Sequence, residues 1–136
     1  MLDFISVMAV SIFIGFLIGI EREIRKKPVG LKTLTLIILS SSTLIYFSRD
    51  LDSSSQSRII QGLLTCYGFI GAGSVIHYSK KFTLGLTTGA LVVFSSIIGI
   101  LIGRKNFLEA IIISLFILFI LTTEGFLEKK FLRKKR

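Results

Sequence analysis

The sequence predicts an all-α membrane protein, built as one bundle of five transmembrane helices. Hydrophobic residues make up 51% of the 136-residue chain, although its formal net charge is +9. The charged residues lie in clusters, and the apolar runs between clusters are long enough to cross a hydrocarbon core. This layout is typical of a polytopic membrane protein. The five expected helices cover residues 4–20, 31–47, 59–78, 84–103 and 107–123.

The first helix carries a stripe of small residues, because Ser11, Gly15 and Gly19 recur every fourth position. Such a stripe is suited to close contact with another helix. No basic residue precedes this helix and no small-residue cleavage pattern follows it, so we expect a retained helix and not a signal peptide. A charged loop with Pro28, the only proline, leads to the second helix, which is rich in hydroxyls.

A polar loop with two aspartates and four serines is expected over residues 49–58. The third helix then contains Gly68, Gly71 and Gly73, and glycine is costly in a helix unless it has a use. A phosphate-binding turn is a poor match, because the order is not G-x-G-x-x-G and no strand or acidic ribose ligand accompanies it. Close helix packing is the first expectation. An interrupted helix beside a cavity is the alternative that stays open.

The fourth helix has small residues at alternating offsets of four and three, which form one continuous face: Gly85, Gly89, Val92, Ser96, Gly99 and Gly103. We expect the third helix to pack against this face and against the Gly15/Gly19 stripe of the first helix. Thr87 and Thr88, near the start of the fourth helix, are first interpreted as hydroxyls that bond within the helix end. The fifth helix is mostly Ile, Leu and Phe and is expected to face lipid.

Basic residues set the expected orientation of the bundle. Five helices place the two termini on opposite sides of the membrane. The first and third loops and the tail together hold thirteen basic residues, whereas the second and fourth loops hold four. Because basic residues favour the cytoplasmic side, we expect the N-terminus outside and the C-terminus inside. Residues 1–123 form the expected transmembrane domain, and residues 124–136 form a basic cytoplasmic tail.

Composition also narrows the function classes. The single cysteine, Cys66, excludes an internal disulfide and a cysteine-based zinc site. No His/Asp/Glu cluster resembles a metal site and no nucleophile has a base nearby in sequence, so we expect neither an enzyme nor a cofactor. The basic residues flank hydrophobic spans, which favours contact with anionic lipid head groups of the bilayer over nucleic acid.

Glu21 and Arg22 directly follow the first helix. One interpretation is a solvated helix end, in which Glu21 pairs with Arg25 and Glu23 with Lys27 at i,i+4 spacing. Exposed pairs of this kind stabilise a protein by only about 0.3–0.5 kcal/mol. The other interpretation places Glu21 and Arg22 at the cytoplasmic rim, facing into the bundle, where charges at membrane depth are usually functional. The residues alone leave both interpretations open.

Four short motifs occur in order along the first four helices. They are Gly15-Phe16-Leu17-Ile18-Gly19-Ile20-Glu21-Arg22-Glu23, Pro28-Val29-Gly30-Leu31-Lys32-Thr33, Arg58-Ile59 followed by Gly68-Phe69-Ile70-Gly71-Ala72-Gly73, and Gly85-Leu86-Thr87-Thr88-Gly89-Ala90. Each is weak alone, but together they resemble the signatures of the MgtC/SapB family of bacterial membrane proteins. The chain departs from the family pattern at Leu34, Cys66 and Val93.

The resemblance implies a multi-pass protein of the bacterial inner membrane. It marks as functional candidates the motif positions Glu21, Arg22, Thr33, Arg58, Thr87 and Thr88. The positions expected to serve helix packing are Gly15, Gly19, Gly68, Gly71, Gly73, Gly85 and Gly89. MgtC-like proteins are linked to survival at low magnesium and are proposed to inhibit the F-type ATP synthase. MgtC itself carries a soluble C-terminal domain, so we expect this chain to be a membrane-only member.

Two functions follow from these expectations. The first is a regulator in magnesium or ion homeostasis that acts by helix contact with a membrane partner, with the ATP synthase as the family's candidate. Its support is the abundance of small-residue faces and the confinement of carboxylates to the span edges. The second is a small transporter or channel for an ion or small solute. It is favoured by the glycine-rich third helix, the short second helix and the charges at the rim, and it would need a homodimer formed across small-residue faces, because five spans are few for a pathway. A scaffold whose glycines serve packing alone is a third interpretation.

Overall fold

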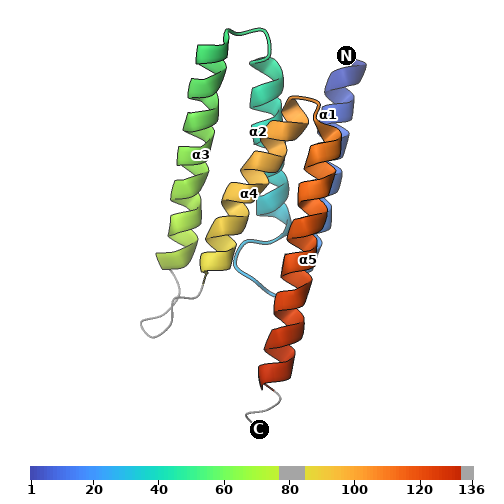
Figure 1. Ribbon diagram of the computed structural model, residues 1–136, viewed down its shortest axis with the longest axis vertical. Coiled ribbons are helices and arrows are strands. Elements are labelled where there is room, and N and C mark those ends of the chain that lie inside the picture. Colours follow the sequence, from blue (N-terminus) through green and yellow to red (C-terminus); the bar gives the residue numbers. More distant parts are fainter. Residues whose placement is uncertain (77–84, 133–136) are drawn as a thin grey trace.

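The predicted all-helical architecture is present in the structure. The computed structural model describes the backbone of residues 1–76 and 85–132, and the side chains of residues 1–75 and 85–123. Within these residues there are five helices and no strand. The helices are α1 (Leu2–Ile24), α2 (Leu31–Phe47), α3 (Ser53–Ile76), α4 (Leu86–Gly103) and α5 (Phe107–Leu132) (Figure 1). The bounds of α2 are those predicted from the sequence.

α3 begins earlier than predicted, at Ser53 and not at residue 59. Asp52 explains the difference, because its Oδ2 accepts hydrogen bonds from the backbone N–H groups of Ser54 and Ser55, both at 3.0 Å. An aspartate in this position satisfies N–H groups that the first helical turn leaves without a partner. The loop predicted over residues 49–58 is therefore wrong from residue 53 onward, since residues 53–58 form the start of α3.

α5 ends later than predicted. The apolar span was expected to stop at residue 123, yet the helical backbone continues to Leu132. The boundary expected between the bundle and a separate tail therefore lies inside a helix. α1 likewise continues past residue 20 and ends at Ile24, so Glu21 and Arg22 lie within its last turns.

Consecutive helices run in opposite directions, as their short connections require (Figure 1). At one end of the bundle, the N-terminus lies beside the loop between α4 and α5, and a salt bridge links them, with Lys105 Nζ 2.6 Å from Asp3 Oδ2. The ring of Phe4 also lies 5.4 Å from that of Tyr46, near the end of α2. We call this the Asp3 end. The opposite end, which holds the last turns of α1 and the first turn of α4, is the Arg22 end.

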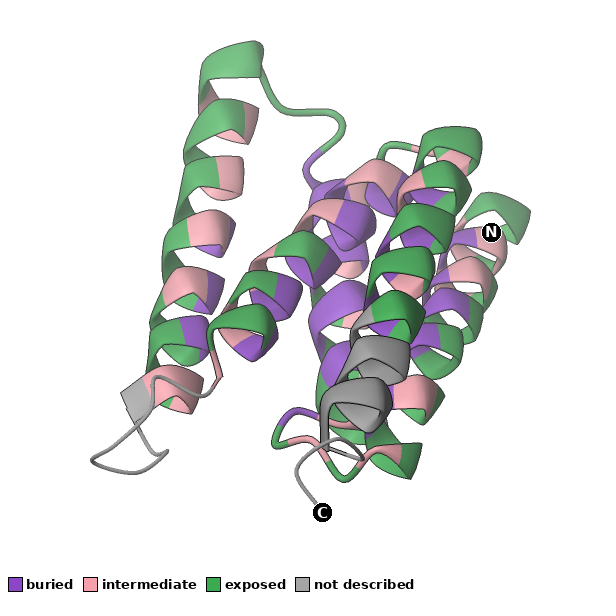
Figure 2. Ribbon diagram, turned by 60° about the horizontal axis from the view of Figure 1, so that its bottom comes forward, coloured by how far each residue is buried: buried purple, intermediate pink, exposed green. Residues whose placement is uncertain are grey.

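α4 is the central helix, since it contacts each of the other four. Its most extensive partners are α2 and α3, while α5 packs on it less closely. At the seam with α2 the two backbones touch. A β-carbon at Gly99 would lie 2.6 Å from the carbonyl oxygen of Ile38, and one at Gly103 would lie 2.6 Å from that of Ser42. Buried residues gather on the facing sides of α1, α2 and α4 (Figure 2).

The Gly15/Gly19 stripe packs against a different helix from the one predicted. A β-carbon at Gly15 would lie 2.6 Å from Thr35 Cα, and one at Gly19 would lie 2.5 Å from Leu31 Cα. Both partners belong to α2, and among the described residues α3 does not contact α1. The expected contact between the first and third helices is therefore wrong. A short loop makes α2 the immediate antiparallel neighbour of α1, and α2 occupies this face.

α3 lies at the edge of the bundle and packs mainly on α4 (Figures 1 and 2). α3 is one uninterrupted helix from Ser53 to Ile76, so the helix does not break at its glycine-rich stretch as the alternative required. Gly71 and Gly89 mark the crossing with α4, since a β-carbon on Gly71 would lie 2.9 Å from the carbonyl oxygen of Gly89. Gly68 and Gly73 differ, because a β-carbon at either position would have no neighbouring atom within 4 Å, so neither shows the close packing expected of it.

Two of the helices, α1 and α4, are long and apolar enough to cross a membrane. α2 and the apolar part of α5, residues 107–123, are shorter apolar helices. Large apolar side chains are also exposed on the outside of the bundle, among them Phe13, Phe116 and Phe119. Exposed apolar surface of this kind is unusual for a soluble monomer and indicates contact with a membrane or another protein.

Candidate functional site

The last turns of α1 carry Arg22 into the interior of the bundle. Ser11, Gly15, Ile18 and Arg22 follow one another at offsets of four, three and four, and all four are buried. Helical residues at these offsets share one face. Arg22 therefore continues the face that packs on the other helices, and its side chain is only 1% exposed.

Arg22 bonds to the first turn of α4. Its Nη2 donates a hydrogen bond to Thr88 Oγ1 at 2.5 Å, and Thr88 is itself buried. Hydrogen bonds that involve a charged group typically contribute about 1.5–3 kcal/mol. The bond joins residues that are 66 positions apart in sequence. It fixes the end of α1 against the start of α4.

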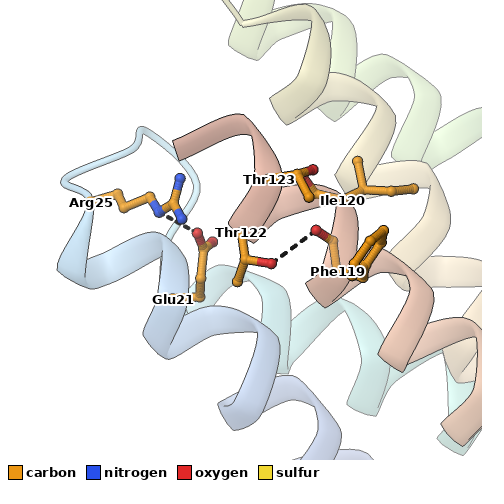
Figure 3. A network of polar contacts seen from close by, with 6 residues as sticks. All are labelled: Glu21, Arg25, Phe119, Ile120, Thr122 and Thr123. Atoms are coloured by element: carbon orange, nitrogen blue, oxygen red, sulfur yellow. Dashed lines mark hydrogen bonds and ion pairs between the residues drawn. The ribbon is translucent and has the colours of Figure 1, made fainter. Parts of the chain in front are cut away.

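Glu21 occupies the rim beside Arg22 and pairs with Arg25 on the next turn of α1 (Figure 3). Thr122 of α5 lies on the same side of α1, and its hydroxyl donates a hydrogen bond to the carbonyl oxygen of Phe119 at 2.9 Å (Figure 3). The two sequence interpretations of this motif therefore apply to different residues. Glu21 forms the local i,i+4 pair, although its carboxylate oxygens are shielded from solvent, whereas Arg22 faces into the bundle.

Glu23 has a role that the sequence reasoning missed. Its Oε2 accepts a hydrogen bond from the backbone N–H of Leu31, the first residue of α2, at 3.2 Å. A carboxylate is favourable at a helix N-terminus, where free N–H groups and the helix dipole are positive. Gly30, which precedes α2, has no side chain to form such a cap, and a β-carbon there would collide with this carboxylate. In the sequence, Gly30 directly before α2 could have indicated that the cap of this helix must come from another residue.

The remaining candidates lie outside the buried Arg22–Thr88 pair. Thr87 is exposed, although it neighbours Thr88 in the first turn of α4. Thr33 is exposed in the first turn of α2, at the same end of the bundle. Arg58 is exposed near the start of α3, which belongs to the Asp3 end. The structure thus joins Arg22 to Thr88, places Glu21 on the adjacent rim and separates Arg58 from them.

Gly85 acts on the backbone and not as a packing residue within a helix. It precedes α4 with φ +106°, a left-handed conformation that glycine adopts far more readily than other residues. A β-carbon there would also lie 2.9 Å from the carbonyl oxygen of Ser74 in α3. Gly85 therefore sets the direction of α4 and hence the position of Thr88.

Farther along α1 from the Arg22–Thr88 pair, buried hydroxyls form a second polar contact between helices. Ser11 Oγ of α1 donates a hydrogen bond to Ser42 Oγ of α2 at 2.7 Å, and Ser42 in turn donates to the carbonyl oxygen of Leu39 at 2.9 Å. Within the described residues, no three His, Cys, Asp or Glu side chains gather as they would around a metal ion. The chemistry that the site supports is a desolvated guanidinium held by a threonine, which ties two helices together.

Comparisons with known proteins place these features in a family. A family model described as the MgtC family matches residues 8–130. The SapB protein of Bacillus subtilis is 32% identical over 125 residues, and the aligned region covers 85% of this chain and 54% of SapB. The MgtC protein of Brucella abortus is 33% identical over 113 residues, with 82% of this chain and 47% of that protein covered.

The MgtC protein of Salmonella typhimurium is 30% identical over 118 residues, and the alignment covers 87% of this chain and 51% of that protein. The chain therefore spans about half the length of the curated relatives that it matches. No solved structure matches the chain.

Proposed function

Because this chain belongs to the MgtC family, we propose that it is a multi-pass protein of the bacterial inner membrane in which all five helices cross the bilayer. α1 and α4 are long and apolar enough to cross a membrane, and the proposal assigns the same role to the helices that pack beside them. α2 packs between α1 and α4, and α5 exposes large apolar side chains between Leu108 and Ile120. Helices that satisfy their own backbone hydrogen bonds are the structures that a bilayer accepts.

The charge of the two ends supports an orientation with the N-terminus outside and the C-terminus inside. By sequence, the helix ends and connecting segments of the Asp3 end carry four basic and four acidic residues. Those of the Arg22 end carry thirteen basic and four acidic residues. The whole net charge of +9 therefore belongs to one end. Excess Lys and Arg marks the cytoplasmic side of a membrane protein.

The proposed function is a regulator in magnesium or ion homeostasis that acts by helix contact with a membrane partner and has no enzymatic activity. The observation that carries it is one face of α3. This open α3 face consists of Arg58, Gly62, Thr65, Cys66, Phe69, Ala72 and Gly73, all of which are exposed. Their spacing places them within one continuous arc of the helix. At Gly62 and Gly73 a β-carbon would have open space around it.

The composition of this face fits another helix better than lipid. In a bilayer, small and hydroxyl residues gather where helices meet, because they let two backbones approach closely. The exposed face of α5 shows the contrast, since Leu115, Phe116 and Phe119 are large and apolar. By family resemblance, the F-type ATP synthase is the proposed partner.

Cys66 allows this contact to be tested in the native chain, because it is the only cysteine and lies on the open α3 face. A photoreactive maleimide attached to Cys66 in isolated bacterial membranes should give a covalent adduct with the partner after illumination. The matched control is Cys66→Ser with Phe119→Cys, which moves the probe to the exposed face of α5. Mass spectrometry of the adduct identifies the protein attached.

The outcomes of this experiment separate the candidate functions. An adduct with another membrane protein, specific to Cys66 and weakened by Gly62→Leu, supports the regulator. Equal labelling from positions 66 and 119 contradicts a partner at α3. An adduct whose mass is twice that of the chain assigns the face to a second copy.

A second copy would favour the alternative, a small homo-oligomeric transporter or channel. The open α3 face is the observation that favours it, because two such faces can close on each other. Liposomes that contain only the purified protein should then show ion or solute flux, and Glu21→Gln serves as the control. Flux no greater than in that control would contradict the alternative.

A further inference from the structure

A groove of about 300 Å³ lies between α4 and α5. Its floor is made by Leu91, Ile117 and Leu121, which are buried, and its walls include Phe94, Phe116 and Ile120, which are exposed. The groove therefore opens outward through large apolar side chains. Thr87, at the Arg22 end, contributes the one hydroxyl of its lining.

The size of the groove restricts what can fill it. An α-helix with its side chains is about 10–12 Å across, so a volume of this size does not admit the helix of a second chain. A flexible hydrocarbon chain fits, because it can lie along the two helices and bury apolar surface against the floor. If α4 and α5 cross the bilayer as proposed above, the open side of the groove faces lipid.

The positive charge at the Arg22 end, where Thr87 lies, favours a lipid with an anionic head group. Thr87 neighbours Thr88, which binds Arg22, and the segment from Glu21 to Lys32 carries five basic and two acidic residues. The first turn of α4 contains no acidic residue. Each Lys or Arg near a membrane surface is worth about 1 kcal/mol of attraction to anionic lipid. We propose that the α4–α5 groove binds one acyl chain of an anionic phospholipid, whose phosphate lies among the basic residues of the described segment from Arg25 to Lys32.

Lipid retention by the purified protein tests this proposal. The protein in detergent is incubated with dioleoyl phosphatidylglycerol or with dioleoyl phosphatidylcholine, and native mass spectrometry measures the fraction that retains lipid. We expect the anionic lipid to be retained at least about fivefold more, which is the ratio that about 1 kcal/mol of charge attraction gives. Equal retention of the two lipids would overturn the proposal.

Ala90→Leu fills the groove and should remove most of the anionic-lipid retention, since Ala90 lines the groove and is exposed. Ala9→Leu is the matched control, because Ala9 is exposed on α1, away from the groove, and should leave retention unchanged. Retention by Ala90→Leu equal to that of the wild type would overturn the groove as the site.

A measurement on the unaltered chain covers the case in which Ala90→Leu does not fold. Phosphatidylglycerol with a photoreactive acyl chain should attach to residues 87–94 and 113–121, and adducts confined to α1 or α3 would contradict the proposal. The inference rests on the proposed membrane insertion but not on the partner. Recovery of the protein outside the membrane fraction would contradict the proposed membrane insertion. Absence of lipid selectivity in a membrane-bound protein would contradict only the proposed lipid site.

Discussion

Thr88 is the residue whose replacement isolates the buried bond at the Arg22 end. Thr88→Val keeps the shape of the side chain but removes the acceptor of the Arg22 hydrogen bond. We expect it to lower the free energy of unfolding by about 1.5–3 kcal/mol, the typical contribution of one hydrogen bond to a charged group. Thermal unfolding of the purified protein in detergent, followed by circular dichroism, measures the change.

The neighbouring threonine supplies the control for this prediction. Thr87→Val makes the same chemical change at an exposed position and should leave the unfolding temperature nearly unchanged. Thr88→Ser retains the hydroxyl and should recover most of the stability. If Thr87→Val and Thr88→Val destabilise the protein equally, the bond to Arg22 contributes nothing specific.

Asp52 makes the start of α3 sensitive to pH. Hydrogen bonds from the hydroxyls and N–H groups of Ser54 and Ser55 hold the pKa of Asp52 below its ordinary value of 3.8. A pKa that is lower in the folded state means that the carboxylate stabilises the fold above pH 3.8 and that this contribution is lost as the pH falls further. Asp52→Ala should therefore lower the unfolding temperature at neutral pH, and its difference from the wild type should shrink under acid conditions.

Asp50→Ala is the control for the cap, because it removes an exposed aspartate of the same loop without removing the acceptor of the Ser54 and Ser55 N–H groups. Unfolding temperatures of the wild type and both variants are compared between pH 7 and the acid range. A constant difference between Asp52→Ala and the wild type across that range would show that the Asp52 carboxylate does not act as the cap.

At the scale of helices, the seam between α2 and α4 should be the part of the bundle that tolerates the least added volume. Gly99→Ala places a methyl group 2.6 Å from both the Ile38 carbonyl oxygen and Ser41 Cβ. The helix backbones must then separate, and overpacking of this kind typically costs about 1–3 kcal/mol. We expect a lower free energy of unfolding, measured by denaturant titration in mixed micelles.

Gly62→Ala makes the same change on the open α3 face, where nothing lies within 4 Å. Alanine is the better helix former by about 1 kcal/mol, so this variant should be neutral or more stable than the wild type. Equal destabilisation by Gly62→Ala and Gly99→Ala would contradict the distinction between a packed and an open glycine.

The helices themselves were largely predictable from the sequence, because apolar runs and charged breaks mark their extent. The start of α3 was missed because serine-rich segments read as loops, and the cap depends on one aspartate. The neighbours of each helix were harder to predict. Gly15 and Gly19 indicate that some backbone comes close, but not that it belongs to α2. A small-residue stripe carries no information about which helix fills it.

The candidate site was predictable in its members but not in its geometry. Resemblance to a family nominated Glu21, Arg22 and Thr88 together, and the structure joins Arg22 to Thr88 while Glu21, the neighbour of Arg22 in sequence, pairs with Arg25. It also nominated Arg58, which lies at the other end of the bundle. The bond between Arg22 and Thr88 spans 66 positions, so only the folded arrangement of α1 and α4 reveals it.

At the scale of the whole molecule, the uneven charge predicts which end faces the cytoplasm. By sequence, the segments that connect or follow the helices at the Arg22 end carry thirteen basic residues and those at the Asp3 end carry four, so the Arg22 end should lie inside the cell. In a Cys66→Ser background, Asp50→Cys should react with a membrane-impermeant maleimide in spheroplasts, whose inner membrane faces the medium. Lys27→Cys, in the loop between α1 and α2, should react only after the membrane is permeabilised. The reverse pattern would contradict the orientation, and labelling of both positions before permeabilisation would contradict a bundle that crosses the membrane.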